Sequence, residues 1–249
     1  MKIVSSPRAK SALSAGLTIF LALTLFTLVV AICRPVNAVS AIKTVTIRPT
    51  VILDAGHGGF DGGATSVTGR LEKDINLEIA LKTRDVLRLF GFDVVMTRTD
   101  DRALANRKKD DMYARLDIVN GNPDSVFVSI HQNHYTQEKY FGAQMFYGSA
   151  SEEESRALSI VLQKNFRENL NSENNRQPKK ADSSLFLFKK AQQPSVLIEC
   201  GFLSNYEEAH LIENEEYQTK IALTIAQSIC EYYKNTDIER KSKNGSAEV

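Results

Sequence analysis

The chain has 249 residues, of which 43% are hydrophobic and 24% are charged, and its formal net charge is +1. This length and composition are sufficient for one globular domain with its own hydrophobic core. The near-neutral charge, without a dense basic patch, excludes electrostatic binding to nucleic acid.

The first residues are expected to direct the chain out of the cytoplasm. Lys2, Arg8 and Lys10 precede an uninterrupted apolar segment over residues 12–33. A membrane-spanning helix needs roughly 20 such residues. The flanking positive charge predicts that the N-terminus stays inside and that the rest of the chain lies outside.

Two outcomes stay open for this segment. Val36-Asn37-Ala38 has small residues spaced like a signal-peptidase site, whereas the length of the apolar segment favours an uncleaved anchor. Residues 1–43 are therefore predicted to be a signal peptide or a membrane anchor with its tether. We expect an exported protein, either secreted or held at the outer face of the cytoplasmic membrane.

Strand-like and helix-like segments alternate along the rest of the chain. Apolar runs bounded by turn residues predict strands at 51–53, 93–97, 125–130, 142–147 and 195–200. Apolar residues at helical spacing predict helices at 72–90, 110–120, 151–170, 205–212 and 216–233. Gly91 is expected to end the first helix, and Ser151 is expected to cap the third. The pattern predicts an α/β fold: one domain over 44–234, with a twisted, mostly parallel sheet of about six strands and helices on both faces.

The remaining segments give weaker signals. Residues 34–49 are expected to form a tether, part of which could pair as an edge strand. Residues 171–183 are expected to form a polar loop, and the apolar run 185–188 does not decide between helix and strand. Residues 235–249 form a polar tail that is expected to fray.

The three cysteines do not make a disulfide framework. Cys33 lies in the apolar N-terminal segment, which leaves Cys200 and Cys230. These two could form a single bridge or remain two buried thiols.

A glycine-rich loop over residues 54–63 follows the first strand. Loops of this kind can bind phosphate. This one lacks the Lys-Ser/Thr ending of a P-loop and the glycine spacing of a dinucleotide site, so a nucleotide-dependent enzyme is not expected.

Histidine and glutamate side chains follow three of the predicted strands. His57, His131 and Glu199 lie at or just after strand ends, and Glu72 begins the helix after the glycine-rich loop. Because parallel strands end at one edge of a sheet, the side chains that follow them converge there. A hydrolytic zinc needs three protein ligands and an open position for water. His57, Glu72 and His131 can supply the ligands, and Glu199 can act as the general base.

Each of these residues also has an ordinary structural interpretation. A strand-terminal histidine is often only hydrogen-bonded, and a glutamate at a helix start often stabilises the helix dipole. A buried glutamate costs several kcal/mol unless it is paired or functional. The presence of all four together favours the zinc hypothesis, with Asp54 and Asp61 as candidate acceptors for the second imidazole nitrogens.

Five blocks along the chain resemble the zinc-dependent N-acetylmuramoyl-L-alanine amidases of the amidase_3 family. The blocks are VILDAGHGGFDGGA (51–64), LEKD (71–74), MTRTD (96–100), SIHQN (129–133) and VLIECGFLSN (196–205). The resemblance covers residues 50–233 and implies cleavage of the amide between the muramic acid lactyl group and L-alanine in peptidoglycan. It also implies one zinc ion per chain on His57, Glu72 and His131, with Glu199 as the catalytic glutamate and the glycan strand and stem peptide as binding partners.

The compact form of the chain is most similar to the germination-specific amidases of spore-forming bacteria. The segment between residues 170 and 185 is too short for the autoinhibitory helix of the division-associated amidases. This resemblance implies action on spore cortex in the forespore–cortex space, where removal of the stem peptide lets a muramic-lactam deacetylase form muramic δ-lactam. It therefore implies that deacetylase or another sporulation protein as a partner.

Several positions depart from the family pattern or leave alternatives open. Gln177 follows Arg176 where the family often has glycine, which puts a substrate role for this arginine in doubt. Asn133 is expected either to hold substrate or to orient His131. His134 and His210 are expected to be exposed. Arg98 and Arg115 are expected to form structural ion pairs rather than to bind the acidic stem peptide.

Two other functions are compatible with the same fold. One is a non-catalytic peptidoglycan-binding protein, which predicts the loss of at least one of the four site residues. The other is a zinc peptidase that cuts within the stem peptide, and it uses the same chemistry at a different bond.

Overall fold

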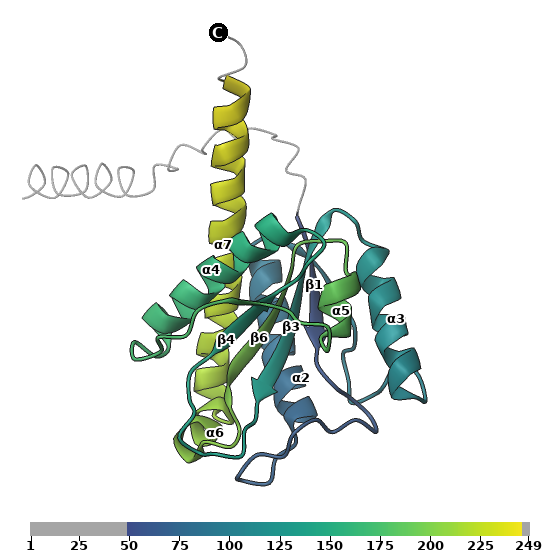
Figure 1. Cartoon of the computed structure of the whole chain (residues 1–249), viewed down its shortest axis with the longest axis vertical. Helices are drawn as coiled ribbons and strands as arrows, with labels where there is room; N and C mark the ends of the chain where they lie inside the picture. The colour runs from purple at the N-terminus through teal and green to yellow at the C-terminus, as the bar shows by residue number, and fades with distance from the viewer. Residues whose placement is uncertain (1–48, 246–249) are drawn as a thin grey trace, which may run out of the picture. The chain divides into compact units, whose positions relative to one another are not determined.

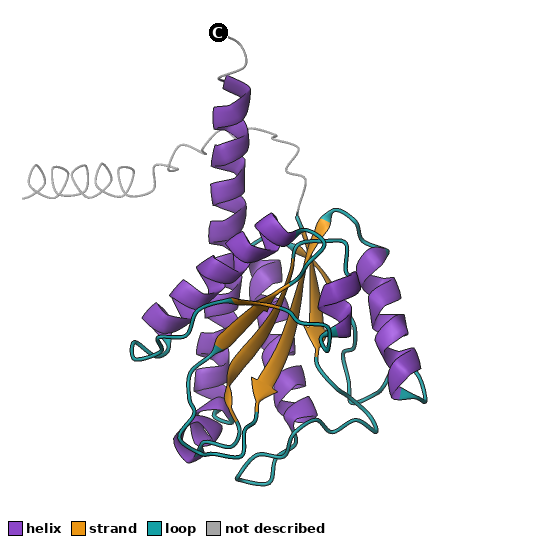
Figure 2. Cartoon of the chain, in the orientation of Figure 1, coloured by secondary structure: helices purple, strands orange, loops and turns teal. Residues whose placement is uncertain are grey.

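Six strands form one sheet in the computed structural model, which describes the backbone of residues 49–245 and the side chains of residues 49–236 (Figures 1 and 2). The predicted N-terminal segment and nearly all of the tether lie outside the described residues. The strands are β1 (Thr50–Ala55), β2 (Asp93–Met96), β3 (Ser125–Asn133), β4 (Gln144–Tyr147), β5 (Lys179–Lys180) and β6 (Ser195–Phe202), in the spatial order β2-β1-β3-β6-β4-β5. The expected α/β fold with a mostly parallel sheet is confirmed.

Four neighbouring strands from one edge of the sheet, β2, β1, β3 and β6, are parallel, and the two strands at the other edge run the opposite way. β1 pairs in parallel with β2 and β3, and β3 pairs in parallel with β6. β4 is antiparallel to β6, and β5 is parallel to β4. The parallel strands β1, β3 and β6 therefore end together at one edge, where open α/β sheets bind ligands.

Side chains along β3 point alternately to the two faces of the sheet, and the proposed site residues share one of these faces. Val128 and Ile130 belong to the larger hydrophobic cluster, whereas Phe127 belongs to the smaller one. Because side chains alternate between faces, Ser129 and His131 lie on the same face as Phe127. The same alternation on β6 puts Glu199 on this face too.

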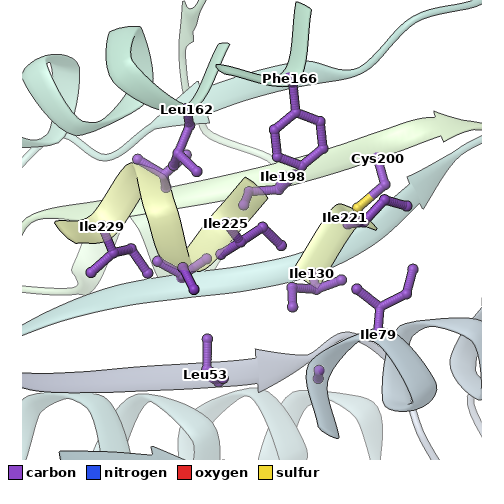
Figure 3. Packing of buried hydrophobic residues seen from close by; sticks show 14 of the residues in the cluster. Leu53, Ile79, Ile130, Leu162, Phe166, Ile198, Cys200, Ile221, Ile225 and Ile229 are labelled. Atoms are coloured by element: carbon purple, nitrogen blue, oxygen red, sulfur yellow. The ribbon is translucent and has the colours of Figure 1, made fainter. Parts of the chain in front are cut away.

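Helices cover both faces. The larger cluster joins the sheet to α2 (Glu72–Leu89), α4 (Glu152–Asn169) and α7 (Glu215–Gly245). Figure 3 shows Leu162 of α4 and Ile225 of α7 in this cluster together with Ile130 and Ile198 of the sheet. The smaller cluster packs α3 (Lys108–Asn120) and the short α5 (Phe186–Lys190) on the other face. One further helix, α6 (Tyr206–Ile212), follows β6. Full burial of one such Leu or Ile side chain contributes about 1.5–3 kcal/mol, so this packing fixes the strand ends that carry the site.

The structure corrects several local expectations. The Ser151 side chain does not cap α4, because its hydroxyl donates to the Gln192 carbonyl instead. The apolar run 185–188 enters a helix, α5, and the loop before it contains the unpredicted strand β5. Helix α7 extends beyond the predicted end at residue 233 and includes the tail as far as Gly245.

Two further features bear on the sequence expectations. Cys200 and Cys230 are free thiols, the first buried and the second half-buried, so the alternative of a bridge between them is wrong.

Within residues 49–245, no helix combines the length and the apolar character that a bilayer-spanning helix needs.

Candidate metal centre

Three strand ends and one helix start bring the predicted site residues together. His57 follows β1, His131 lies near the end of β3, and β3–β6 pairing sets Glu199 beside His131 in register. Glu72 is the first residue of α2, so its carboxylate lies at the helix N-terminus, where the dipole favours negative charge.

His57, Glu72 and His131 form the candidate metal cluster. One ligand atom from each lies within 4.8 Å of the others. His57 Nε2 is 3.2 Å from Glu72 Oε2, and His131 Nδ1 is 3.0 Å from Glu72 Oε1. The two imidazole rings meet edge to face, with centroids 4.9 Å apart. The Glu72 carboxylate therefore faces Nε2 of His57 and Nδ1 of His131.

The Glu72 carboxylate is held by further donors. Its Oε2 accepts from the Ala64 backbone N–H at 2.9 Å, and its Oε1 accepts from the Gln132 backbone N–H at 3.1 Å and from Asn76 Nδ2 at 3.2 Å. Burial raises the pKa of Glu72, but hydrogen bonds from His131 and His57 outweigh that effect and bring the pKa far below its usual range. The carboxylate is thus fixed in its anionic form, as a metal ligand must be.

His57 has an unusual backbone conformation and a fixed ring. Its φ is +61°, in the left-handed region that non-glycine residues rarely adopt. Its Nδ1 lies 3.0 Å from Asp61 Oδ2, and Lys108 Nζ lies 3.0 Å from the same oxygen. Asp61 is therefore placed where an acceptor for the second nitrogen of a ligand imidazole is needed.

His131 is packed closely against the glycine-rich loop. A Cβ added to Gly56 would lie 2.2 Å from His131 Nε2, so only glycine leaves room for this ring. Burial lowers the pKa of His131, but the neighbouring Glu72 and Glu199 carboxylates raise it above its usual value overall. The ring is thus set between the two glutamates.

Asp54 does not contact either imidazole, contrary to its expected role. Its Oδ1 accepts from Arg115 Nη1 at 2.6 Å and from the Thr97 hydroxyl at 2.7 Å, and its Oδ2 accepts from the Ser129 hydroxyl at 2.6 Å. Burial raises the pKa of Asp54, but Arg115 and these hydroxyls lower it to about 2 overall. Since these donors occupy both oxygens, Asp54 belongs to a structural ion pair.

Glu199 is the unpaired acid of the site. Its Oε2 is shielded from solvent and has no hydrogen-bond partner among the described residues. Burial, together with the Glu72 charge, raises its pKa to about 7 overall, although His131 and His57 oppose the shift. A carboxyl group whose pKa lies near neutrality is suited to accept and return a proton.

Two pockets flank this arrangement. The first is a cavity of about 150 Å³ lined by His57 and His131, by the apolar residues 185–188 at α5, and by mostly charged side chains of α3. The second lies beside β4 and is lined by Asn133, Tyr135, Tyr140, Gln144, Phe146, Arg176, Lys179 and Phe202. The metal cluster therefore adjoins a concave surface that can receive a chain-like substrate.

Arg176, His134 and His210 are not part of the metal cluster. Arg176 lies in the second pocket, where its guanidinium stacks on Phe202 with 4.7 Å from Cζ to the ring centroid. His134 is exposed, and His210 is exposed and packs against Tyr206. Both histidines are thus surface residues, as expected.

Arg98 and Arg115 are both buried. Arg115 forms the expected structural ion pairs with Asp54 and Asp111. Among the described residues Arg98 makes no ion pair, contrary to expectation, and its hydrogen bonds go to backbone carbonyls.

Three residues beside the proposed ligands and Glu199 were not predicted from the sequence. Asn76 and Gln132 brace Glu72, and Gln144 lies opposite Glu199 in the β4–β6 register. One helical turn separates Asn76 from Glu72, and Gln132 directly follows His131. Proximity to the proposed ligands could therefore have identified these two.

The donor set fits a zinc ion. Two imidazoles and one carboxylate converge within 4.8 Å, and the carboxylate is kept ionised. These are ligand types that a catalytic zinc takes when one coordination position stays open for water.

Comparison with known proteins agrees with this geometry. Residues 51–231 match the family model Amidase_3, N-acetylmuramoyl-L-alanine amidase. The germination-specific N-acetylmuramoyl-L-alanine amidase of Bacillus subtilis is 40% identical over 193 residues, which cover 74% of this chain and 79% of that protein. The CwlD amidase of Clostridioides difficile, solved in complex with the GerS lipoprotein, is 40% identical with a TM-score of 0.71, covering 75% of this chain and 99% of that one.

A second solved structure, an N-acetylmuramoyl-L-alanine amidase from Clostridium difficile 630, is 30% identical with a TM-score of 0.68 and covers 75% of this chain and 97% of that one. The family match spans most of the chain and contains every residue of the metal cluster together with Glu199. The chain therefore belongs to the Amidase_3 family and is an N-acetylmuramoyl-L-alanine amidase, a hydrolase of cell-wall peptidoglycan.

Proposed function

We propose that one zinc ion binds to His57, Glu72 and His131, and that Glu199 is the general base of amide hydrolysis. The observation that carries this proposal is the convergence of two imidazoles and an ionised carboxylate within 4.8 Å, with Glu199 paired in register to His131. The match to the amidase family supports the same assignment.

The roles of the side chains follow from their surroundings. When bound, the zinc ion makes a coordinated water more acidic and polarises the scissile carbonyl. Glu199 takes the proton of the attacking water and delivers it to the departing nitrogen of L-alanine. Its raised pKa suits both steps, because the group can be ionised before attack and can release the proton afterwards. Asp61 fixes the ring orientation of His57 through Nδ1.

The natural substrate in this proposal is spore-cortex peptidoglycan. The enzyme removes the stem peptide from muramic acid as a step toward muramic δ-lactam, and a deacetylase then acts on the freed residue. This assignment is supported by 40% identity to the germination-specific amidase of Bacillus subtilis. The same degree of identity to a relative solved with a lipoprotein supports a sporulation partner for this chain as well.

The N-terminal segment completes the proposal. Lys2, Arg8 and Lys10 before the apolar residues 12–33 support export, with the catalytic part at the outer face of the membrane or released from it. In a spore-forming cell this side corresponds to the space between the forespore and the cortex, where the substrate is laid down.

Product analysis tests this function. The zinc-loaded full-length protein is incubated with purified cortex and vegetative peptidoglycan, and the products are identified by mass spectrometry. We expect free L-alanine amino termini on intact stem peptides, with faster release from cortex. Cuts between two amino acids would indicate a zinc peptidase, the absence of products would indicate a binding protein, and equal rates on both substrates would contradict the cortex assignment.

A further inference from the structure

Two buried arginines hold the backbone that carries His57. Arg98 is 1% exposed and Arg115 is 2% exposed, although neither contacts the Glu72 carboxylate. We propose that Arg98 and Arg115 act together as a clamp on the carbonyls of residues 55–57, which sets the position of His57 as a metal ligand. This arginine clamp deepens the proposed function and rests on it, because it concerns the zinc site.

The contacts of the clamp cover three consecutive carbonyls. Arg98 donates from Nε to the Ala55 carbonyl at 2.8 Å and from Nη2 to the Gly56 carbonyl at 3.0 Å. Arg115 donates from Nη1 to the Ala55 carbonyl at 3.0 Å and from Nη2 to the His57 carbonyl at 2.6 Å. Every peptide carbonyl from the end of β1 to His57 is therefore fixed by a guanidinium.

The clamp also ties this loop to the surrounding elements. Arg98 Nη2 donates to the Lys73 carbonyl at 2.8 Å, one residue after Glu72. Arg115 is anchored on the other side by Asp54 on β1 and Asp111 on α3. The two arginines thus connect the backbone of His57 to the start of the helix that carries Glu72.

The conformation of His57 explains why such a clamp is needed. Its φ of +61° is unfavourable for a residue with a side chain, and such a conformation persists only when its surroundings impose it. In this conformation His57 Nε2 lies 3.2 Å from Glu72 Oε2. Without the hydrogen bond from Arg115 to the His57 carbonyl, the residue would be free to relax away from the cluster.

Planar guanidiniums suit this role better than ammonium groups. One arginine presents several N–H donors in a fixed fork, whereas lysine is a single compact charge. Arg98 uses this fork on four backbone carbonyls, those of Ala55, Gly56, Lys73 and Asp100. A lysine at either position keeps the charge but cannot span neighbouring carbonyls.

The test separates a positioning role from a general loss of stability. Arg98→Lys and Arg115→Lys variants of the full-length protein are compared with Leu162→Ala, which opens a cavity in the core between α4 and the sheet, away from the site. Zinc affinity is measured by competition with a chromophoric chelator, Co²⁺ absorption reports ligand geometry, and thermal unfolding reports stability.

We expect each lysine variant to bind zinc about ten- to a hundredfold more weakly, which is typical when a group that orients a ligand is lost. The Co²⁺ spectrum should change as well. Leu162→Ala should lower the unfolding temperature but retain wild-type zinc affinity and spectrum. The clamp is refuted if the lysine variants bind zinc as wild type does, or if Leu162→Ala weakens binding equally.

A second measurement does not depend on zinc binding. Hydrogen exchange of the Gly56 and Gly58 amides is followed in zinc-free wild type, Arg98→Lys, Arg115→Lys and Leu162→Ala. These amides donate to the Ile130 and Asp61 carbonyls, so a loop released by loss of the clamp should exchange faster in the lysine variants than in Leu162→Ala. Equal exchange in wild type and the lysine variants would overturn the clamp. If wild type binds no zinc, the proposed function fails, while this measurement still decides the clamp.

Discussion

His131 on β3 and Glu199 on β6 are cross-strand neighbours, paired in register at the carboxyl edge of the sheet. The first contributes Nδ1 to the metal cluster, and the second has a buried oxygen without a partner among the described residues. One strand pairing thus sets the distance between a proposed zinc ligand and the proposed general base. Rigid strands hold this distance more closely than loops do.

Replacement of Glu199 by glutamine should separate metal binding from chemistry. Glu199→Gln keeps the shape of the side chain but cannot take up a proton, so we expect an activity loss of about a hundred- to ten-thousandfold. Zinc content, measured by elemental analysis, should stay at one ion per chain. Glu152→Gln, at an exposed glutamate of α4, should change neither quantity. Wild-type activity in Glu199→Gln would rule out its role as base.

A side chain at position 56 should displace His131 and so weaken zinc binding. A methyl group at this position would lie 2.2 Å from His131 Nε2, so the ring must move from its place beside Glu72. We expect Gly56→Ala to weaken zinc binding at least about tenfold, by analogy with other losses of ligand orientation. Gly62→Ala is the matched control, because its added methyl would meet only Leu71 at 3.5 Å. Equal zinc affinity in the two variants would contradict the close packing of His131.

Asp61 should affect zinc affinity through its contact with His57, because it is not itself a proposed metal ligand. Asp61→Ala removes the acceptor 3.0 Å from His57 Nδ1, and we expect zinc affinity to fall about ten- to a hundredfold. Isothermal titration of zinc into the metal-free protein measures this change. Asp182→Ala, at an exposed aspartate before α5, serves as the control. Unchanged affinity in Asp61→Ala would show that His57 is oriented by its backbone alone.

The buried pair of Asp54 and Arg115 predicts a specific acid sensitivity. The folded-state pKa of Asp54 is about 2, below its ordinary value of 3.8. A depressed pKa means that ionised Asp54 contributes stability that is complete above pH 3.8 and is lost as the pH falls toward 2. The shift corresponds to about 2 kcal/mol.

Denaturant unfolding of the zinc-free protein between pH 5 and about pH 2 measures this contribution. Asp54→Asn should be less stable than wild type at pH 5, and the gap should narrow toward pH 2. A constant difference between the two proteins across this range would contradict the assignment.

The sequence was most informative where chemistry and periodicity coincide. The runs before His57, His131 and Glu199 are long and apolar, so their strand type and common edge could be predicted. β5 could not be predicted, because it is a two-residue strand of lysines that pairs only through its backbone. The apolar run 185–188 fits helix and strand equally, and tertiary packing decides between them.

Partners far apart in sequence account for the errors at the site. Asp54 looked like an acceptor for a ligand imidazole, but Arg115, 61 residues away in the chain, takes its carboxylate. Arg98 was expected in an ion pair, yet it donates to backbone carbonyls. Every residue has a carbonyl, so the sequence does not indicate which ones an arginine binds. Asp61 lies beside His57 Nδ1, as its place in the same loop suggests, and its role as the acceptor for a ligand imidazole stays a prediction.

The location of the metal tests the account most directly. Crystals of the full-length protein grown with zinc should show one anomalous-scattering peak, which marks the position of the zinc ion. The ion should lie about 2.0–2.2 Å from His57 Nε2, from a Glu72 carboxylate oxygen and from His131 Nδ1, with Glu199 beside the open coordination position. A zinc ion bound elsewhere, or an empty cluster in the presence of excess zinc, would contradict it.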